Sequence, residues 1–186
     1  MFLDITNFDY DKDIIPFTRN GIIVDTSIIK IIIDGFISVR FTGIKPSQLP
    51  EYENLLYFFD LIKVNNKWDK FLITPHILAE VCNHFRNTYN KYHNYKDIVK
   101  EFLPIIKDMG EHPISKKEII HYIESKNPVI EIGDISMFLV ADDFISKNEK
   151  TAILAKDTRL SNTYFDHPKV MVMDYKSIAL NILQRA

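Results

Sequence analysis

Four carboxylates in this sequence are candidates for metal chemistry, namely Asp25, Glu80, Asp134 and Asp157. If such groups share one crevice, two unit charges ~4 Å apart repel each other by roughly 4 kcal/mol at an effective dielectric of ~20. Hard divalent cations such as Mg²⁺ or Mn²⁺ remove this repulsion, because they prefer carboxylate and water oxygens as ligands. A bound cation of this kind lowers the pKa of a water and clamps a phosphate. We therefore interpret the four acids as candidate catalytic residues and metal ligands.

Two of these acids follow short apolar runs that are typical of buried strands. Asp25 comes directly after Ile22-Ile23-Val24, and Asp157 comes just after the run that contains Ile153-Leu154. In parallel α/β sheets, ligands bind beyond the carboxyl ends of the strands. We therefore expect both side chains at one edge of a sheet, although either acid could instead serve only a helix cap or a turn.

The other two acids lie near the starts of expected helices. Thr74 is a suitable N-cap and Pro75 a suitable first residue for a helix that follows the strand expected at residues 71–73. Glu80 then falls on the second turn of that helix, and Asp134 begins another helix after residue 130. A solvent-exposed role for Glu80 and a capping role for Asp134 are the simpler alternatives.

Strand-like and helical patterns alternate along the rest of the chain. Further strands are expected at residues 152–154 and 170–173, and helices at 28–33, 55–62, 75–85, 87–108, 133–145 and 177–183, with one more that begins at Ser115. We expect the helix at 28–33 to stop at Asp34-Gly35, and residues 42–51 to form a loop. This alternation predicts an α/β fold around a central, mainly parallel sheet.

The composition fits a single domain over residues 1–186, with an extension at 1–19, a core at 20–175 and a C-terminal helix at 176–186. Hydrophobic residues make up 46% and charged residues 26%, and the one cysteine fits a reducing compartment. No apolar run approaches the ~18 residues of a membrane span. We expect a cytoplasmic protein without a membrane partner, and the net charge of −2 does not decide whether it binds nucleic acid.

The four acids also stand in segments that resemble the motifs of the PIN-domain family, in the same order along the chain. These segments are Ile22-Ile23-Val24-Asp25-Thr26-Ser27, Thr74-Pro75-His76-Ile77-Leu78-Ala79-Glu80-Val81, Ile132-Gly133-Asp134-Ile135-Ser136-Met137-Phe138-Leu139-Val140-Ala141 and Ile153-Leu154-Ala155-Lys156-Asp157-Thr158-Arg159-Leu160. The resemblance covers roughly residues 20–175. The sequence differs at Ala155, where the fourth motif usually carries a hydroxyl residue, and in its greater length between Glu80 and Asp134.

The resemblance implies a three-layer α/β/α fold and an endoribonuclease that uses Mg²⁺ or Mn²⁺. In such enzymes the acids, here Asp25, Glu80, Asp134 and Asp157, hold metal and activate water for in-line attack on an RNA phosphodiester. The expected products carry a 5′-phosphate and a 3′-hydroxyl. Many relatives are toxins of toxin–antitoxin pairs, so the resemblance also implies an antitoxin as a protein partner.

Other functions are open at this point. A haloacid-dehalogenase-type phosphatase needs a second aspartate where this chain has Ser27, and a receiver domain needs an acidic pair where Asp25 stands alone. The alternative from another class is a catalytically inactive PIN-like module that binds RNA or protein. The basic, tyrosine-rich segment at residues 84–96 favours packing or a homodimer contact, and its basic residues could also contact RNA.

Overall fold

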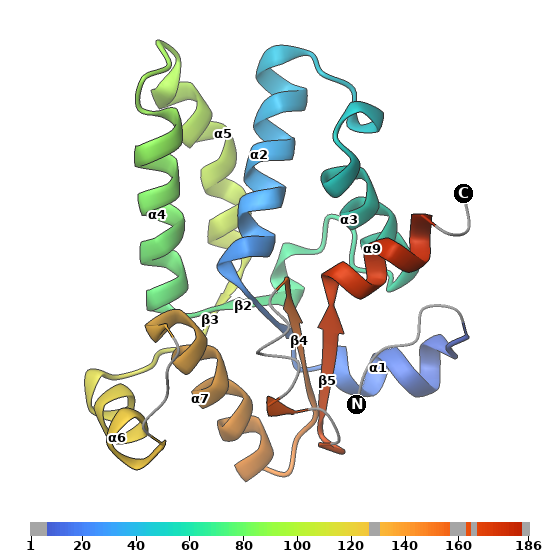
Figure 1. The fold of residues 1–186 in the computed structure, drawn as a ribbon, viewed down its shortest axis with the longest axis vertical. Coiled ribbons are helices and arrows are strands. Elements are labelled where there is room, and N and C mark those ends of the chain that lie inside the picture. The colour runs from blue at the N-terminus through green and yellow to red at the C-terminus, as the bar shows by residue number, and fades with distance from the viewer. Residues whose placement is uncertain (1–6, 127–130, 157–162, 165–166, 184–186) are drawn as a thin grey trace.

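A computed structural model shows an α/β fold with a parallel central sheet, and it describes residues 7–126, 131–156, 163–164 and 167–183 (Figure 1). The strands are β1 (Ile22–Val24), β2 (Phe71–Ile73), β3 (Gly110–Glu111), β4 (Thr151–Ala155) and β5 (Val170–Asp174). Within the described residues they form one sheet in the order β3-β2-β1-β4-β5, and every neighbouring pair is parallel. The expected three-layer α/β/α class is confirmed.

Helices flank this sheet on both sides. The α-helices are α1 (Ile15–Thr18), α2 (Thr26–Thr42), α3 (Pro50–Leu61), α4 (Pro75–Tyr89), α5 (Tyr95–Asp108), α6 (Lys116–Lys126), α7 (Ile132–Ser146) and α9 (Tyr175–Leu183). Short turns of other helix types are η1 (Tyr10–Ile14), η2 (Pro46–Gln48) and η3 (Trp68–Lys70). Helices α2 and α7 both contact β4, and α2 also packs against α3, α4 and α5.

Strand β1 lies in the middle of the sheet and is buried along its whole length. Its first residue, Ile22, pairs with Phe71 of β2 on one side and with Ala152 of β4 on the other. Chain order reverses between β1 and β4, because β2 and β3 lie on one side of β1 and β4 and β5 on the other. Such a switch point leaves a crevice beyond the strand ends, which is where ligands bind in this class of fold.

Helix α2 is longer than the sequence indicates. The expected stop at Asp34-Gly35 is wrong, because α2 continues to Thr42 and ends at Gly43, whose φ of 71° is left-handed. Gly35 stays helical for a tertiary reason: a Cβ there would lie 2.1 Å from Cγ of Tyr52, so the missing side chain makes room for that ring. A local pattern cannot reveal such a contact with α3.

The middle of the chain contains two helices and a strand. The helical section expected over residues 87–108 is interrupted, because α4 ends at Tyr89 and α5 starts at Tyr95. Strand β3 was not expected, since it has two residues and no apolar run. It pairs with β2 through Leu72 and Gly110, where a Cβ on the glycine would lie 2.8 Å from Cδ2 of that leucine.

The turn between α4 and α5 begins next to a packed aromatic cluster. Tyr89 is buried, its ring centroid lies 6.0 Å from that of Phe85 and 5.8 Å from that of Tyr92, and its hydroxyl donates to Asp34. Packing is therefore confirmed for this tyrosine, whereas Tyr92 is exposed.

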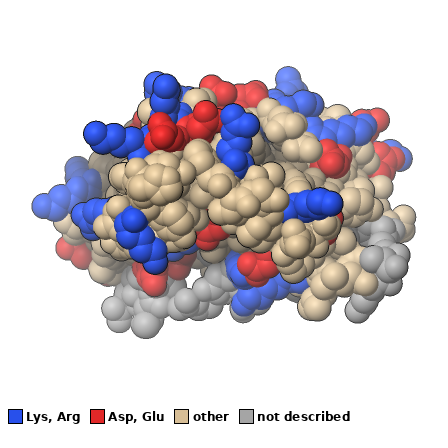
Figure 2. Space-filling model, turned by 90° about the horizontal axis from the view of Figure 1, so that it is seen from above, with Lys and Arg blue, Asp and Glu red and all other residues tan. Residues whose placement is uncertain are grey.

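Figure 2, which views the molecule from above, shows basic and acidic side chains interspersed around a centre of other residues. In the described part of the chain, no helix is long and apolar enough to cross a membrane.

Candidate functional site

Three of the four predicted site residues line one pocket, which we call the acidic pocket. It has a volume of about 340 Å³, and its walls include Asp25, Glu80 and Asp134. Asp25 lies between β1 and α2, Glu80 is on α4 and Asp134 is on α7. The fourth residue, Asp157, lies outside the described residues, but Lys156, which precedes it in the chain, lines the same pocket.

Asp25 is the most buried of these acids. Its residue is only 9% exposed, and its backbone N–H donates to the carbonyl of Leu154 at 3.0 Å, which fixes the end of β1 against β4. Burial raises the pKa of the Asp25 carboxyl above its ordinary value, and the Ser27 hydroxyl, which donates to Oδ2, and the charge of Lys30 act in the opposite direction. Burial, and not repulsion by a neighbouring carboxylate, is therefore the cause of the raised pKa of Asp25.

Glu80 is held between α2 and α7. Oγ1 of Thr26 donates to Oε2 of Glu80 at 2.7 Å. The other oxygen, Oε1, lies where a side chain of Gly133 would be: a Cβ on this glycine would be 2.6 Å from it. The second motif thus supplies the carboxylate, the first supplies its hydrogen-bond donor and the third supplies the space.

A buried hydroxyl pair joins the starts of α4 and α7. The Thr74 hydroxyl accepts from the backbone N–H of Ile77 at 3.2 Å, as expected for an N-cap, and lies 2.7 Å from Oγ of Ser136. Ser136 donates to the carbonyl of Gly133 at 2.7 Å. Because the hydroxyl proton of Ser136 is used in that bond, the Thr74 hydroxyl is the donor to Oγ of Ser136. The pair fixes the first turns of the two helices that carry Glu80 and Asp134.

The acidic pocket also contains charged residues that sequence reasoning missed: Lys30, Glu131, Lys156 and Lys176. Lys30 follows Thr26 by four residues, so the two share one face of α2, and this spacing was a usable signal. Lys156 forms an ion pair with Glu51 of α3. The three lysines offset the acids, so the pocket offers both carboxylate oxygens and positive charge.

The donor set of the acidic pocket fits a hard divalent cation. Asp25, Glu80 and Asp134 offer only oxygen, which Mg²⁺ and Mn²⁺ prefer. Among the described residues, no three His, Cys, Asp or Glu side chains already stand close enough to hold a metal ion. A hydroxyl group donates to one oxygen of Asp25 and to one oxygen of Glu80, and because a carboxylate has about four lone-pair positions, these bonds are compatible with metal coordination.

No model of a protein family matches the chain, and no curated protein matches it in sequence. The functional argument therefore depends on the geometry and chemistry of the acidic pocket.

Proposed function

We propose that this protein is a metal-dependent endoribonuclease that hydrolyses RNA phosphodiester bonds. The observation that supports this proposal is the meeting of Asp25, Glu80 and Asp134, from three separate elements, in one pocket beyond the strand ends. Asp25 and Asp134 line the same pocket although they are 109 positions apart in the chain. If these acids served only as helix caps or surface residues, we would not expect all three to line one pocket.

The acidic and the basic residues of the acidic pocket have different roles in this proposal. Asp25, Glu80 and Asp134, with Asp157 as the proposed fourth member, would hold the cation and orient the attacking water. When bound, Mg²⁺ or Mn²⁺ supplies charge neutralisation at the phosphate and a more acidic water. The lysines of the pocket contact phosphate oxygens and offset the negative charge of the substrate.

Burial of Asp25 favours an active enzyme over the inactive PIN-like module. A carboxylate loses hydration when it is buried, and such a group is costly without a partner charge. The raised pKa of Asp25 reflects this loss. A cation in the pocket compensates for it, whereas an inactive module gains nothing from keeping the acid there. On the basis of the resemblance to the PIN-domain family, we also propose that the protein is a cytoplasmic toxin with an antitoxin as its partner. A homodimer is a further proposal.

Thermal stability in the presence of Mn²⁺ tests this proposal together with an RNA cleavage assay. A cation at 100 times its Kd stabilises a protein by ~2.7 kcal/mol, which corresponds to roughly 5–10 °C for a chain of this size. We expect this shift for the parent protein and for Glu149→Gln, an exposed acid outside the pocket, and a much smaller shift for Asp134→Asn. Cleaved RNA should carry 5′-phosphates. No shift and no cleavage in the parent protein would support the inactive module.

A further inference from the structure

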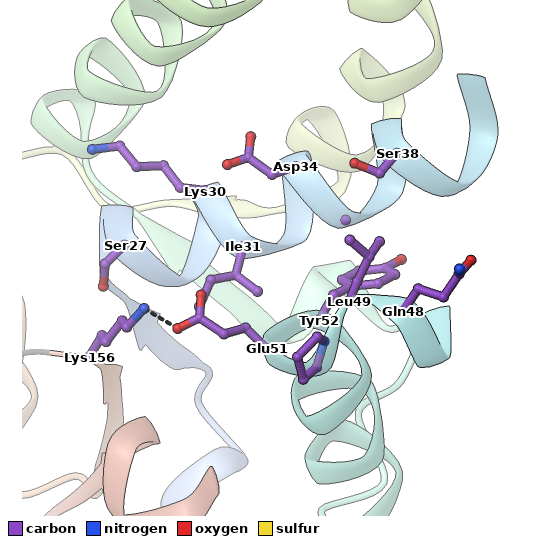
Figure 3. A pocket seen from close by; sticks show the side chains of 12 residues that line it. Ser27, Lys30, Ile31, Asp34, Ser38, Gln48, Leu49, Glu51, Tyr52 and Lys156 are labelled. Carbon is purple, nitrogen blue, oxygen red and sulfur yellow. Dashed lines mark hydrogen bonds and ion pairs between the residues drawn. The ribbon is translucent and has the colours of Figure 1, made fainter. Parts of the chain in front are cut away.

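A second pocket opens directly beside the acidic pocket, and we call it the side pocket (Figure 3). Its volume is about 460 Å³, which falls within the range of ~300–1,000 Å³ typical of small-molecule sites. Ser27, Lys30 and Lys156 line both pockets, so the two hollows share a wall. A ligand that extends beyond the acidic pocket on this side enters the side pocket next.

The side pocket has an apolar floor and a polar rim. Ile31 of α2 faces Leu49 and Tyr52, which lie on the segment before α3 and on its first turn (Figure 3). The rim carries Ser38 and Gln48, whose side chains offer both hydrogen-bond donors and acceptors. This combination suits a planar ring with apolar faces and polar edges.

The wall that the pockets share carries positive charge. Lys30 lines the acidic pocket, the side pocket and a third hollow next to α4. Lys156 projects toward Glu51 and pairs with it within the lining of the side pocket (Figure 3). Lys156 is thus engaged with a carboxylate, whereas Lys30 lies between the acidic pocket and the side pocket, where it is placed to contact a phosphate that joins two parts of one ligand.

We propose that the side pocket binds the nucleobase of the RNA nucleotide next to the phosphodiester that is cut in the acidic pocket. This inference rests on the proposed ribonuclease function and adds a base subsite to it. The base stacks on the floor and its polar edge meets Ser38 and Gln48, while the adjoining phosphate lies near Lys30. Bases are available in this way only where RNA is single-stranded, so the substrate is a loop or an unpaired segment.

Blocking the side pocket tests the inference. Ser38→Phe places a ring in the pocket from α2, and Thr42→Phe places the same ring on the same helix outside the pocket. Binding of a fluorescent single-stranded RNA is measured in Ca²⁺, which is expected to limit turnover. We expect about tenfold weaker binding for Ser38→Phe, consistent with loss of one base stack, and parent-like binding for Thr42→Phe. Gln48→Ala, which removes a rim contact without adding bulk, should weaken binding by a smaller factor.

An RNA with one abasic nucleotide beside the mapped cleavage position provides the second measurement. If the side pocket holds that base, the abasic RNA binds the parent protein about tenfold more weakly, and Ser38→Phe adds little further loss. The base subsite would be overturned if Ser38→Phe weakened binding of the intact RNA and of the abasic RNA by the same factor. It would also be overturned if Ser38→Phe and Thr42→Phe bound the intact RNA equally well. In either case, cleavage by the parent protein would still support the ribonuclease. Absence of RNA binding and cleavage by the parent protein would overturn both proposals.

Discussion

Replacing Gly133 by alanine perturbs the position of Glu80 without removing any charged group. The new Cβ would lie 2.6 Å from Oε1 and 3.3 Å from Cδ of Glu80, so the carboxylate has to move. Its other oxygen accepts from Thr26 at 2.7 Å, and a shift of the carboxylate lengthens that hydrogen bond. The substitution therefore disturbs one acid of the proposed site through a contact that only the folded protein contains.

The expected magnitude follows from two opposing effects. A hydrogen bond to a charged group contributes ~1.5–3 kcal/mol, and the lower half of this range applies because Glu80 is partly exposed. Alanine is favoured over glycine in a helix by up to ~1 kcal/mol, and less in a first turn. Because Oε1 and Cδ lie at the far end of a flexible side chain, Glu80 can turn and keep part of the hydrogen bond, so the net prediction is a loss of at most ~1 kcal/mol in the free energy of unfolding, or a few degrees in Tm.

Urea unfolding of a double-mutant cycle provides the assay. The cycle combines Gly133→Ala with Thr26→Val, which keeps the buried shape of the side chain and removes the donor. Once Thr26 no longer binds Glu80, the alanine should be neutral or stabilising. A stabilisation of ~1 kcal/mol by Gly133→Ala alone would show that only helix propensity operates, and would refute the close packing of Glu80 on α7.

Three further predictions concern buried polar groups. Thr74→Val removes the cap of α4 and the donor to Ser136, so urea unfolding should show a loss of ~1–3 kcal/mol; a parent-like value would contradict the hydroxyl pair. Burial raises the folded-state pKa of Asp25 above the ordinary 3.8, so stability is lost as pH rises through the folded pKa. Asp25→Asn, which cannot ionise, should therefore melt higher than the parent at pH 7 without metal, and this advantage should shrink below pH 3.8; an equal or lower Tm at pH 7 would count against burial of the charge. Tyr89→Phe removes the hydroxyl that donates to Asp34 and should cost ~1–2 kcal/mol in urea unfolding, whereas the exposed control Tyr92→Phe should have little effect; equal effects would contradict this contact.

The sequence predicts the elements whose signals are local. Strand β1 and the Thr74 cap appear where the residue pattern places them. The α/β class follows from the alternation of these elements. Local patterns are enough here because each signal depends on neighbours within one turn or one strand.

The sequence does not predict features that arise from contacts between distant segments. Helix α2 passes through Gly35 because Tyr52 of α3 packs on it, and β3 forms because β2 offers a free edge to two residues that have no strand pattern. Lys176 of the acidic pocket was missed for the same reason, since it reaches the pocket only when β5 is placed at the sheet edge. Asp25 was selected as an acid after a strand, and Glu80 and Asp134 as acids near helix starts. The hydroxyl partners of Asp25 and Glu80 become evident only in the folded chain.

Cleavage of single-stranded RNA by the parent protein and by Asp25→Asn tests the central proposal most directly. Both proteins are assayed in Mn²⁺ under single-turnover conditions, with circular dichroism as a check that the variant is folded and Glu149→Gln as the matched control outside the acidic pocket. We expect metal-dependent cleavage by the parent and the control, and loss of cleavage by at least ~100-fold in a folded Asp25→Asn protein, since removal of a ligand disables the cation site. Cleavage at the parent rate by folded Asp25→Asn would contradict the assignment of the acidic pocket as the active site.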